Sequence, residues 1–219
     1  MPLRPWIRNV FACLAVVLLA GCQPKPQALP RYSAGIGAPP RSILVVPVVN
    51  TSTEVQAADV FLTTLAIPLV ERGYYVFPTH MVKRTMEDDG LGDADLVHAA
   101  DTKRLAEIFG ADAVLYATVT DWNSRYIVLA TNTSVAIRYD LRLGRTGETI
   151  WSEDMRYVHK AGPQSSGNPL ADLIAGAIVA AVERASPSYL PLAIQANNQA
   201  ILSQQSKLPP GPYYRAPQQ

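Results

Sequence analysis

Few residues in this chain of 219 have the types and spacing that catalysis or metal binding requires. Its three histidines, His80, His98 and His159, are far apart in the sequence, and none belongs to an HExxH motif. The acidic segment 88–95 lacks the alternating ligands and the later Glu of a calcium-binding loop. The serine pair 165–166 has the type of a nucleophile, but its polar, glycine-flanked surroundings are typical of a linker. These patterns predict no enzyme, no metal site and no cofactor.

Composition and charge exclude further classes of protein. The formal net charge is +1 at pH 7, and 48% of the residues are apolar. Nucleic-acid-binding domains carry clustered Lys and Arg, so this near-neutral balance predicts no nucleic-acid partner. Two Cys residues are too few for a disulfide framework or a Cys-rich zinc site. The length suits one folded domain with additional terminal segments.

Cys22 has the clearest chemistry, because it follows an amino-terminal export signal. Arg4 and Arg8 precede an apolar run over residues 10–20, which is too short to span a bilayer as a helix. The string Leu19-Ala20-Gly21-Cys22 comes next and resembles the bacterial lipobox, in which a peptidase cuts before a lipid-modified Cys. The alternative is an ordinary signal peptide followed by a Cys that is there by chance.

The lipobox resemblance implies a lipid anchor. It implies three acyl chains on Cys22, and two or more chains hold a protein on a bilayer essentially permanently. Gln23, standing where Asp would retain a lipoprotein, implies sorting to the outer membrane, with the domain on the periplasmic side. The lipid bilayer is therefore the first partner that the sequence predicts.

Composition divides the chain into four parts. Residues 1–21 are the expected signal peptide, and residues 22–40 contain five Pro and two Gly, as in a semi-stiff tether that does not pack. Apolar periodicity places a folded periplasmic domain at residues 41–190. Residues 191–219 are rich in Pro and Gln and are expected to form a polar tail without a core of its own.

The periodicity within residues 41–190 predicts an α/β (α+β) fold with a mixed sheet. A β-branched run, a helical pattern and a short strand form a βαβ opening, at residues 43–49, 58–72 and 74–77. Thr53 and Gln56 have capping-box spacing before the helix, and Gly73 is expected to end it.

The second half of the domain is expected to begin with helices and to continue as an antiparallel sheet. Residues 80–109 show a helical pattern in two pieces around the acidic loop, with Gly110 as the stop. Alternating patterns then predict strands at residues 113–122, 125–130, 133–143 and 149–158, the last two joined by a hairpin turn. A final helix is expected at residues 170–184.

Two features indicate candidate protein interfaces. Trp122 and Trp151 lie on predicted strands whose aromatic residues must in part face away from the core, although half-buried sheet aromatics are commoner than interface aromatics. The helix at 170–184 is apolar nearly all round, and its small residues Gly176 and Ala180 mark either a buried face or a contact with another protein. A homo-oligomer is therefore among the expected partners.

Three stretches taken together resemble one protein family. They are residues 42–54, residues 68–78 with the string Gly73-Tyr-Tyr-Val-Phe-Pro78, and residues 108–113. They resemble the bacterial lipoprotein family that includes a neisserial vaccine-candidate surface lipoprotein, over roughly residues 41–185. More distantly, residues 140–151 are similar to the hairpin of the TolB amino-terminal domain and of curli-secretion lipoproteins. The resemblance implies an α/β sandwich and roles in envelope assemblies, and it supplies no catalytic residues.

These observations lead to one expected function and two alternatives. We expect an outer-membrane-anchored lipoprotein that acts as a non-enzymatic docking or assembly component of a cell-envelope or secretion complex. Tethering raises the concentration of the domain near other envelope proteins, so weak contacts suffice. A regulator or enzyme of peptidoglycan metabolism would instead need polar groups that converge in a pocket, and a small-ligand carrier would need a large apolar cavity.

Overall fold

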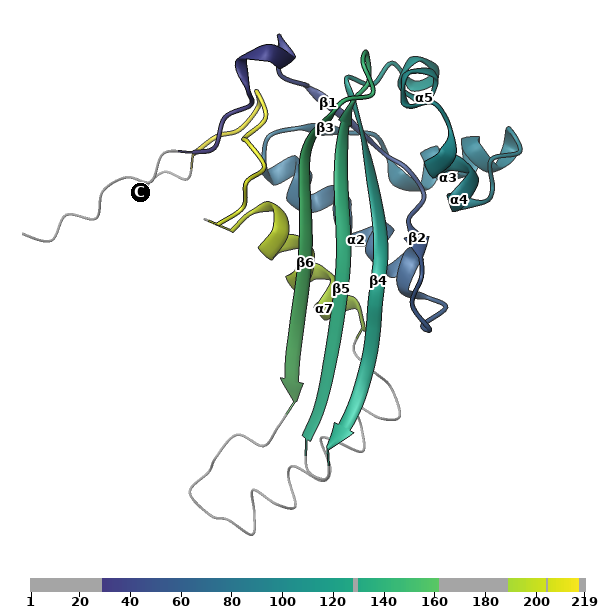
Figure 1. The fold of residues 1–219 in the computed structure, drawn as a ribbon, viewed down its shortest axis with the longest axis vertical. Coiled ribbons are helices and arrows are strands. Elements are labelled where there is room, and N and C mark those ends of the chain that lie inside the picture. Colours follow the sequence, from purple (N-terminus) through teal and green to yellow (C-terminus); the bar gives the residue numbers. More distant parts are fainter. Residues whose placement is uncertain (1–28, 128–129, 162–188, 204, 217–219) are drawn as a thin grey trace, which may run out of the picture.

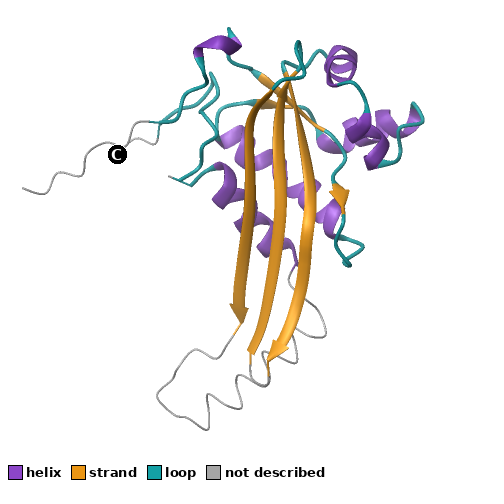
Figure 2. Cartoon of the chain, viewed as in Figure 1, coloured by secondary structure: helices purple, strands orange, loops and turns teal. Residues whose placement is uncertain are grey.

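The sheet of this protein is mixed and open, with helices on both faces (Figures 1 and 2). The computed structural model describes residues 29–127, 130–161, 189–203 and 205–216. In chain order the elements are η1 (Ala34–Ile36), β1 (Ser42–Val45), β2 (Val49–Asn50), α2 (Ala57–Glu71), β3 (Tyr75–Val76), α3 (Thr79–Asp88), α4 (Ala94–Ala99), α5 (Thr102–Phe109), β4 (Ala113–Ile127), β5 (Ala130–Leu143), β6 (Thr149–Ala161) and α7 (Tyr189–Ile201). The strand order is β3-β1-β4-β5-β6, and β2 pairs with β4 as well. The predicted mixed α/β fold is confirmed.

The first half of the sheet is parallel. Strand β1 lies between β3 and β4 and runs parallel to both, and α2 makes the connection to β3. Pro47 divides the predicted strand 43–49 in two, because proline has no N–H for the ladder. The chain leaves β1 at Val45 and pairs with β4 again at Val49, and every residue of this run is buried.

The two ends of α2 differ in how well the sequence predicted them. The prediction of a capping box formed by Thr53 and Gln56 is wrong. The helix begins at Ala57, and the side chain of Gln56, which precedes it, makes no cap hydrogen bond. The stop is confirmed, since Gly73 has a φ of 91° and donates its N–H to the carbonyl of Val70 (2.9 Å). The next N–H, that of Tyr74, reaches the carbonyl of Leu69 (3.2 Å), which completes a Schellman motif.

The second half of the sheet is antiparallel, as predicted, but it has fewer and longer strands. The patterns at residues 113–122, 125–130 and 133–143 belong to only two strands, β4 and β5, which pair along their whole length. Residues 144–147 form the turn into β6. Figure 1 shows that β4, β5 and β6 extend well past the helices.

Helices α3, α4 and α5 cover the face of the sheet opposite α2, where the sequence predicted only two helical pieces. Asp101 separates α4 from α5, because its carboxylate accepts the N–H of Lys103 (3.0 Å) and so caps a new helix. Gly110 ends α5 with a φ of 67°, as expected. None of the described helices is long and apolar enough to cross a membrane.

The sheet therefore separates two apolar cores. The larger one lies between the sheet and helices α2 and α7, and it contains Phe61, Leu65, Leu115, Tyr139, Trp151 and Ala196 among others. The smaller one lies between β1, β4 and helices α3 to α5, and it contains Leu44, Val46, Val82, Met86, Leu105 and Tyr116. Strand β4 supplies side chains to both.

The structure corrects the prediction of a polar tail at residues 191–219, because the described residues of this segment, up to Tyr214, fold onto the domain. Helix α7 buries Leu192 and Ile201, and Leu208 beyond it is fully buried. Asn197 is fully buried too: its Nδ2 donates to Thr64 Oγ1 (2.8 Å), and the Tyr139 hydroxyl donates to its Oδ1 (2.6 Å). An amide typical of a polar tail is here a satisfied hydrogen-bonding group in the core.

Residues 206–214 form a strap across the end of α2. The Arg72 guanidinium donates from Nε to the carbonyl of Leu208 (2.9 Å) and also from Nη2. The Gly211 N–H donates to the carbonyl of Arg72 (2.9 Å), and the Tyr74 hydroxyl donates to that of Pro209 (2.6 Å). The strap thus satisfies polar groups that the end of α2 leaves without helical partners.

The amino-terminal segment packs as well, which shortens the predicted tether 22–40. Ile36 is 4% exposed, and the hydroxyl of Tyr32 lies 2.6 Å from that of Tyr74. Because the Tyr74 hydroxyl donates to the strap, it accepts from Tyr32. The folded part therefore begins before residue 41.

We expect Gly211→Ala to destabilise the protein. A Cβ at this position would lie 2.6 Å from the carbonyl carbon of Gly73 and 2.8 Å from the Tyr74 ring, so the strap must move. Overpacking of this kind costs about 1–3 kcal/mol of unfolding free energy. Thermal unfolding followed by circular dichroism measures the loss. Gly35→Ala is the matched control, since a Cβ there meets nothing within 4 Å, and an equal effect of both variants would contradict the close packing of the strap.

The stability should also fall at alkaline pH. Burial raises the pKa of Tyr32 to about 12, from 10.0 for a free tyrosine. The unfolded chain then loses this proton first, so the stabilisation is complete below about pH 10 and is lost as the pH rises towards 12. We expect Tyr32→Phe to reduce the slope of unfolding free energy against pH in this range by up to about 1.4 kcal/mol per pH unit. Denaturant titrations at several pH values test this, with Tyr75→Phe, which removes a phenol that is 52% exposed, as the control. An unchanged slope for Tyr32→Phe would contradict it.

Candidate functional site

Three of the predicted anchor and interface residues lie outside the described residues, as does the serine pair 165–166. They are Cys22, expected to carry the anchor, and Gly176 and Ala180 on the helix expected at residues 170–184. Their roles stay predictions.

Trp122 and Trp151 are described, and both lie in the larger core. Their side chains are 3% and 5% exposed. Trp122 meets Phe61 edge to face, with ring centroids 5.4 Å apart, and Trp151 lies 5.8 Å from the Tyr139 ring. This corrects the expectation that these aromatic residues face outward as a protein interface.

A β-bulge explains the position of Trp122. Val119 pairs with Ile137 and Asp121 with Ala136, so that Thr120 is the extra residue on β4. One extra residue reverses the alternation of side chains along a strand. Trp122 consequently points into the core, whereas Asp121 reaches the opposite face of the sheet.

The smaller core contains a polar group of side chains, and one of them contacts the segment at Pro47 that connects β1 and β2. His98 Nε2 lies 3.0 Å from the carbonyl oxygen of Pro47, and its ring meets Tyr116 edge to face at 5.1 Å. The Tyr116 hydroxyl is bonded to Thr102 Oγ1 (2.9 Å), and the Arg142 guanidinium lies over its ring. Burial lowers the pKa of His98 and raises the pKa of Tyr116, so both are neutral at pH 7.

The acidic segment at residues 88–95 has structural tasks. Asp93 accepts the N–H of Asp95 (2.8 Å) and caps α4, and Asp88 pairs with Arg84 (3.2 Å). Within the described ranges, no group of three or more His, Cys, Asp or Glu side chains is placed to hold a metal ion.

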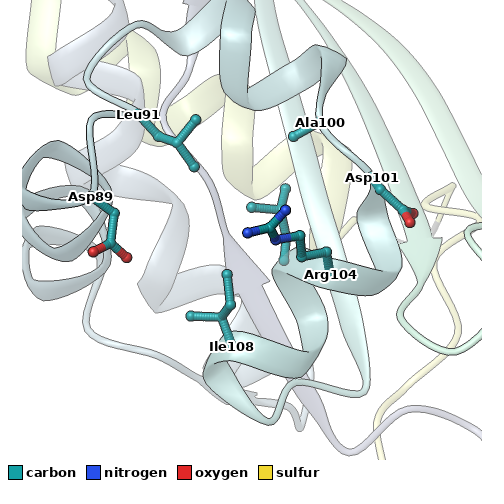
Figure 3. Close-up of a pocket in the computed structure, with 7 residues that line it drawn as sticks. Asp89, Leu91, Ala100, Asp101, Arg104 and Ile108 are labelled. Atoms are coloured by element: carbon teal, nitrogen blue, oxygen red, sulfur yellow. The ribbon is translucent and has the colours of Figure 1, made fainter.

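An open cavity of about 640 Å³ lies between α5 and the loop that follows α3 (Figure 3). The side chains that line it are Asp89, Leu91, Ala100, Asp101, Arg104, Leu105 and Ile108. Its size falls within the range of about 300–1,000 Å³ that is usual for small-molecule binding sites.

The cavity carries one cation, Arg104, together with two carboxylates, Asp89 and Asp101, and apolar side chains such as Leu91 and Ile108. Figure 3 shows the Arg104 guanidinium pointing across the cavity toward the side that carries Leu91 and Asp89, with Ile108 below it, whereas the Asp101 carboxylate points away. No ion pair of Arg104 occurs among the described side chains. A guanidinium binds a carboxylate in a bidentate manner, so this arrangement can hold an acidic group with an aliphatic neighbour.

Sequence reasoning did not find this cavity, although one signal was present. In the sequence, Ile108 follows Arg104 by one helical turn, so the two side chains share one side of α5. In the structure Ile108 is 51% exposed, so an apolar side chain faces solvent beside Arg104. The loop that closes the other wall comes from a different part of the chain, which no local pattern indicates.

Comparison with known proteins places the chain in a family. The profile of the family described as "Putative lipoprotein GNA1162-like" matches residues 31–213. The chain belongs to the GNA1162-like lipoproteins. A curated relative from Neisseria meningitidis serogroup B, described as "Putative lipoprotein NMB1124/NMB1162", is 36% identical over 173 residues, which are 79% of this chain and 78% of the relative. The predicted family is therefore confirmed.

A solved structure of the family agrees with this assignment. The crystal structure of lipoprotein GNA1162 from Neisseria meningitidis is 37% identical, has a TM-score of 0.54, and covers 67% of this chain and 97% of its own. PelC from Paraburkholderia phytofirmans is 15% identical with a TM-score of 0.44, over 77% of this chain and 91% of its own, a likeness that does not bear on function. The match from residue 31 to residue 213 spans both segments that pack outside the predicted domain, namely the one with Ile36 and the strap.

Proposed function

We propose that this GNA1162-like lipoprotein is anchored in the outer membrane through acylated Cys22, faces the periplasm, and acts as a non-enzymatic docking component of an envelope assembly. The docking proposal rests on the Arg104 guanidinium, which has no ion pair among the described residues and lies at a solvent-open cavity beside the apolar side chains of Leu91 and Ile108. The anchor proposal rests on the lipobox string that ends at Cys22, together with the family.

The partner is defined by the chemistry of the cavity. Arg104 offers charge-assisted hydrogen bonds to a carboxylate, and Leu91 and Ile108 offer apolar contact to its neighbour. We infer an envelope protein that presents an acidic side chain beside an aliphatic one. Confinement to one membrane surface raises the local concentration of both proteins, so a single such contact suffices for binding.

The length of the tether is compatible with such a contact. Cys22 and Ile36, which is packed, are 14 positions apart. A fully extended chain of this length spans at most about 45–50 Å. The anchor therefore keeps Ile36 within about 50 Å of the bilayer surface.

The anchor is tested by Cys22→Ser. In a chain exported with a conventional signal peptide, we expect this variant to fold and to leave the membrane fraction, because it has no thiol to acylate. Cell fractionation with detection of the chain measures this. Cys13→Ser in the natural sequence is the matched control and should stay with the membranes, since residue 13 is removed with the signal. Recovery of the exported Cys22→Ser chain with membranes, or a mature terminus without acyl groups by mass spectrometry, would overturn the anchor.

The docking cavity is tested by photo-crosslinking in the native envelope. A photoreactive residue in place of Ile108 should give a discrete adduct, and adding Arg104→Glu should reduce it at least fivefold, because the carboxylate of the partner is then repelled. A photoreactive residue at Val55, which is 87% exposed in the loop before α2, is the control and should not respond to Arg104→Glu. An adduct at residue 108 that does not depend on Arg104 would count against the cavity as the docking site.

A further inference from the structure

We propose that strand β6 is the surface at which a second copy of this chain binds, the two β6 strands pairing antiparallel about Met155 and joining the two sheets. The occupant is thus a second copy, related to the first by a two-fold axis. This inference goes beyond docking at the cavity, because it involves neither Cys22 nor Arg104.

Strand β6 is the long open edge of the sheet. It is last in the strand order, and among the described residues it pairs only with β5 (Figure 1). The edge strand at the other end, β3, has two residues. Residues 151–158 contain no Pro or Gly, and the irregularity of β6 lies before them, between Thr149 and Trp151. An edge of this kind offers a row of free N–H and C=O groups to another strand.

Charges on the outer face fit a second copy in one register. With Met155 opposite itself, Asp154 lies opposite Arg156 of the second copy, and the two-fold axis repeats this pair. Both side chains are largely exposed, at 70% and 61%. Within the chain, Asp154 already binds Arg138 (2.7 Å) and Arg156 binds Asp121 (2.9 Å). The pairing would therefore join these into a row of alternating charges across the interface.

Neighbouring registers are disfavoured by the same charges. Moving the axis by one residue places either Asp154 or Arg156 opposite its own copy. Like charges directly opposite each other destabilise an antiparallel pair. Met155 is therefore the position of the axis that the charges select.

The inner face supplies an independent observation. Glu153 Oε2 is buried and has no hydrogen-bond partner among the described residues. It lies beside a cavity of about 120 Å³ that Met155 and residues of α7, such as Gln199, also line. In the proposed register Tyr157 of the second copy lies opposite Glu153, on the same face, so its hydroxyl can donate to the unsatisfied carboxylate oxygen.

Cysteine capture tests the register in the full-length chain in its native envelope. Cα atoms directly opposite in an antiparallel pair are about 4.5–5.5 Å apart, within the range of a disulfide. Since the mature chain expected here has no Cys other than Cys22, Met155→Cys should give a disulfide-linked dimer on mild oxidation. Val158→Cys is the matched control, because its two copies would be about 20 Å apart at about 3.3 Å per residue. We expect at least tenfold more dimer from Met155→Cys.

Charge variants distinguish pairing from a merely structural effect. Added to Met155→Cys, either Asp154→Lys or Arg156→Glu places like charges opposite each other in a homodimer, and each should reduce capture at least fivefold. In a mixed dimer of the two variants, the introduced lysine faces the introduced glutamate, and the native Arg156 of one chain faces the native Asp154 of the other. Producing both, with different tags, should therefore restore capture between them. Loss of the ion pairs to Arg138 and Asp121 within one chain is not repaired by mixing.

Three results would overturn the proposal. The first is equal capture at residues 155 and 158, which would mean random collision. The second is absence of dimer from a Met155→Cys chain that is exported at the normal level, which would mean that the edge is covered by another segment or protein, or that Glu153 keeps it from pairing. The third is failure of the mixed charge variants to recover capture.

Discussion

Strand β4 is paired on both edges and covered on both faces over its first residues, and the rest of the molecule is arranged around this burial. Val114 and Tyr116 face one core, and Leu115 and Ala117 face the other, all at 0–3% exposure. A strand that is apolar on both sides needs helices on both sides. Helices α2 and α7 cover one face, and α3, α4 and α5 cover the other, so the layers follow from this one strand.

The same strand divides the molecule into two halves with different surfaces. Where β4 pairs with β1 and β2, both faces are covered, and the docking cavity lies in the helical layer beyond the smaller core. On the other side of β4 lie β5 and β6, and helix α7 packs on one face of these two strands. The opposite face is lined by ion pairs such as that of Arg138 with Asp154, and it ends at the free edge of β6. The two proposed contacts therefore lie on separate surfaces and need not compete.

Elements with a strong local pattern were predictable, and elements that depend on distant partners were not. The βαβ opening and the stops at Gly73 and Gly110 follow from periodicity and from residues that tolerate positive φ. Helix α7 escaped prediction, because its stripe consists of small residues, such as Ala193 and Ala196, among Gln and Asn. Its burial depends on α2 and β5, and Asn197 is satisfied only by side chains from those two elements.

The sequence alone indicated the family, the fold class and a string that resembles a lipobox, because each of these is carried by local stretches of residues. The lipobox-like string that ends at Cys22 is a linear pattern, which can be found without any folded structure. The tertiary structure decided where the sheet aromatics point, which segments join the core, and which edge stays open. A bulge of one residue turns Trp122 inward, and strand order places β6 outermost. These outcomes depend on which strands and helices meet in space, and such non-local pairings leave no mark on the pattern of any single segment.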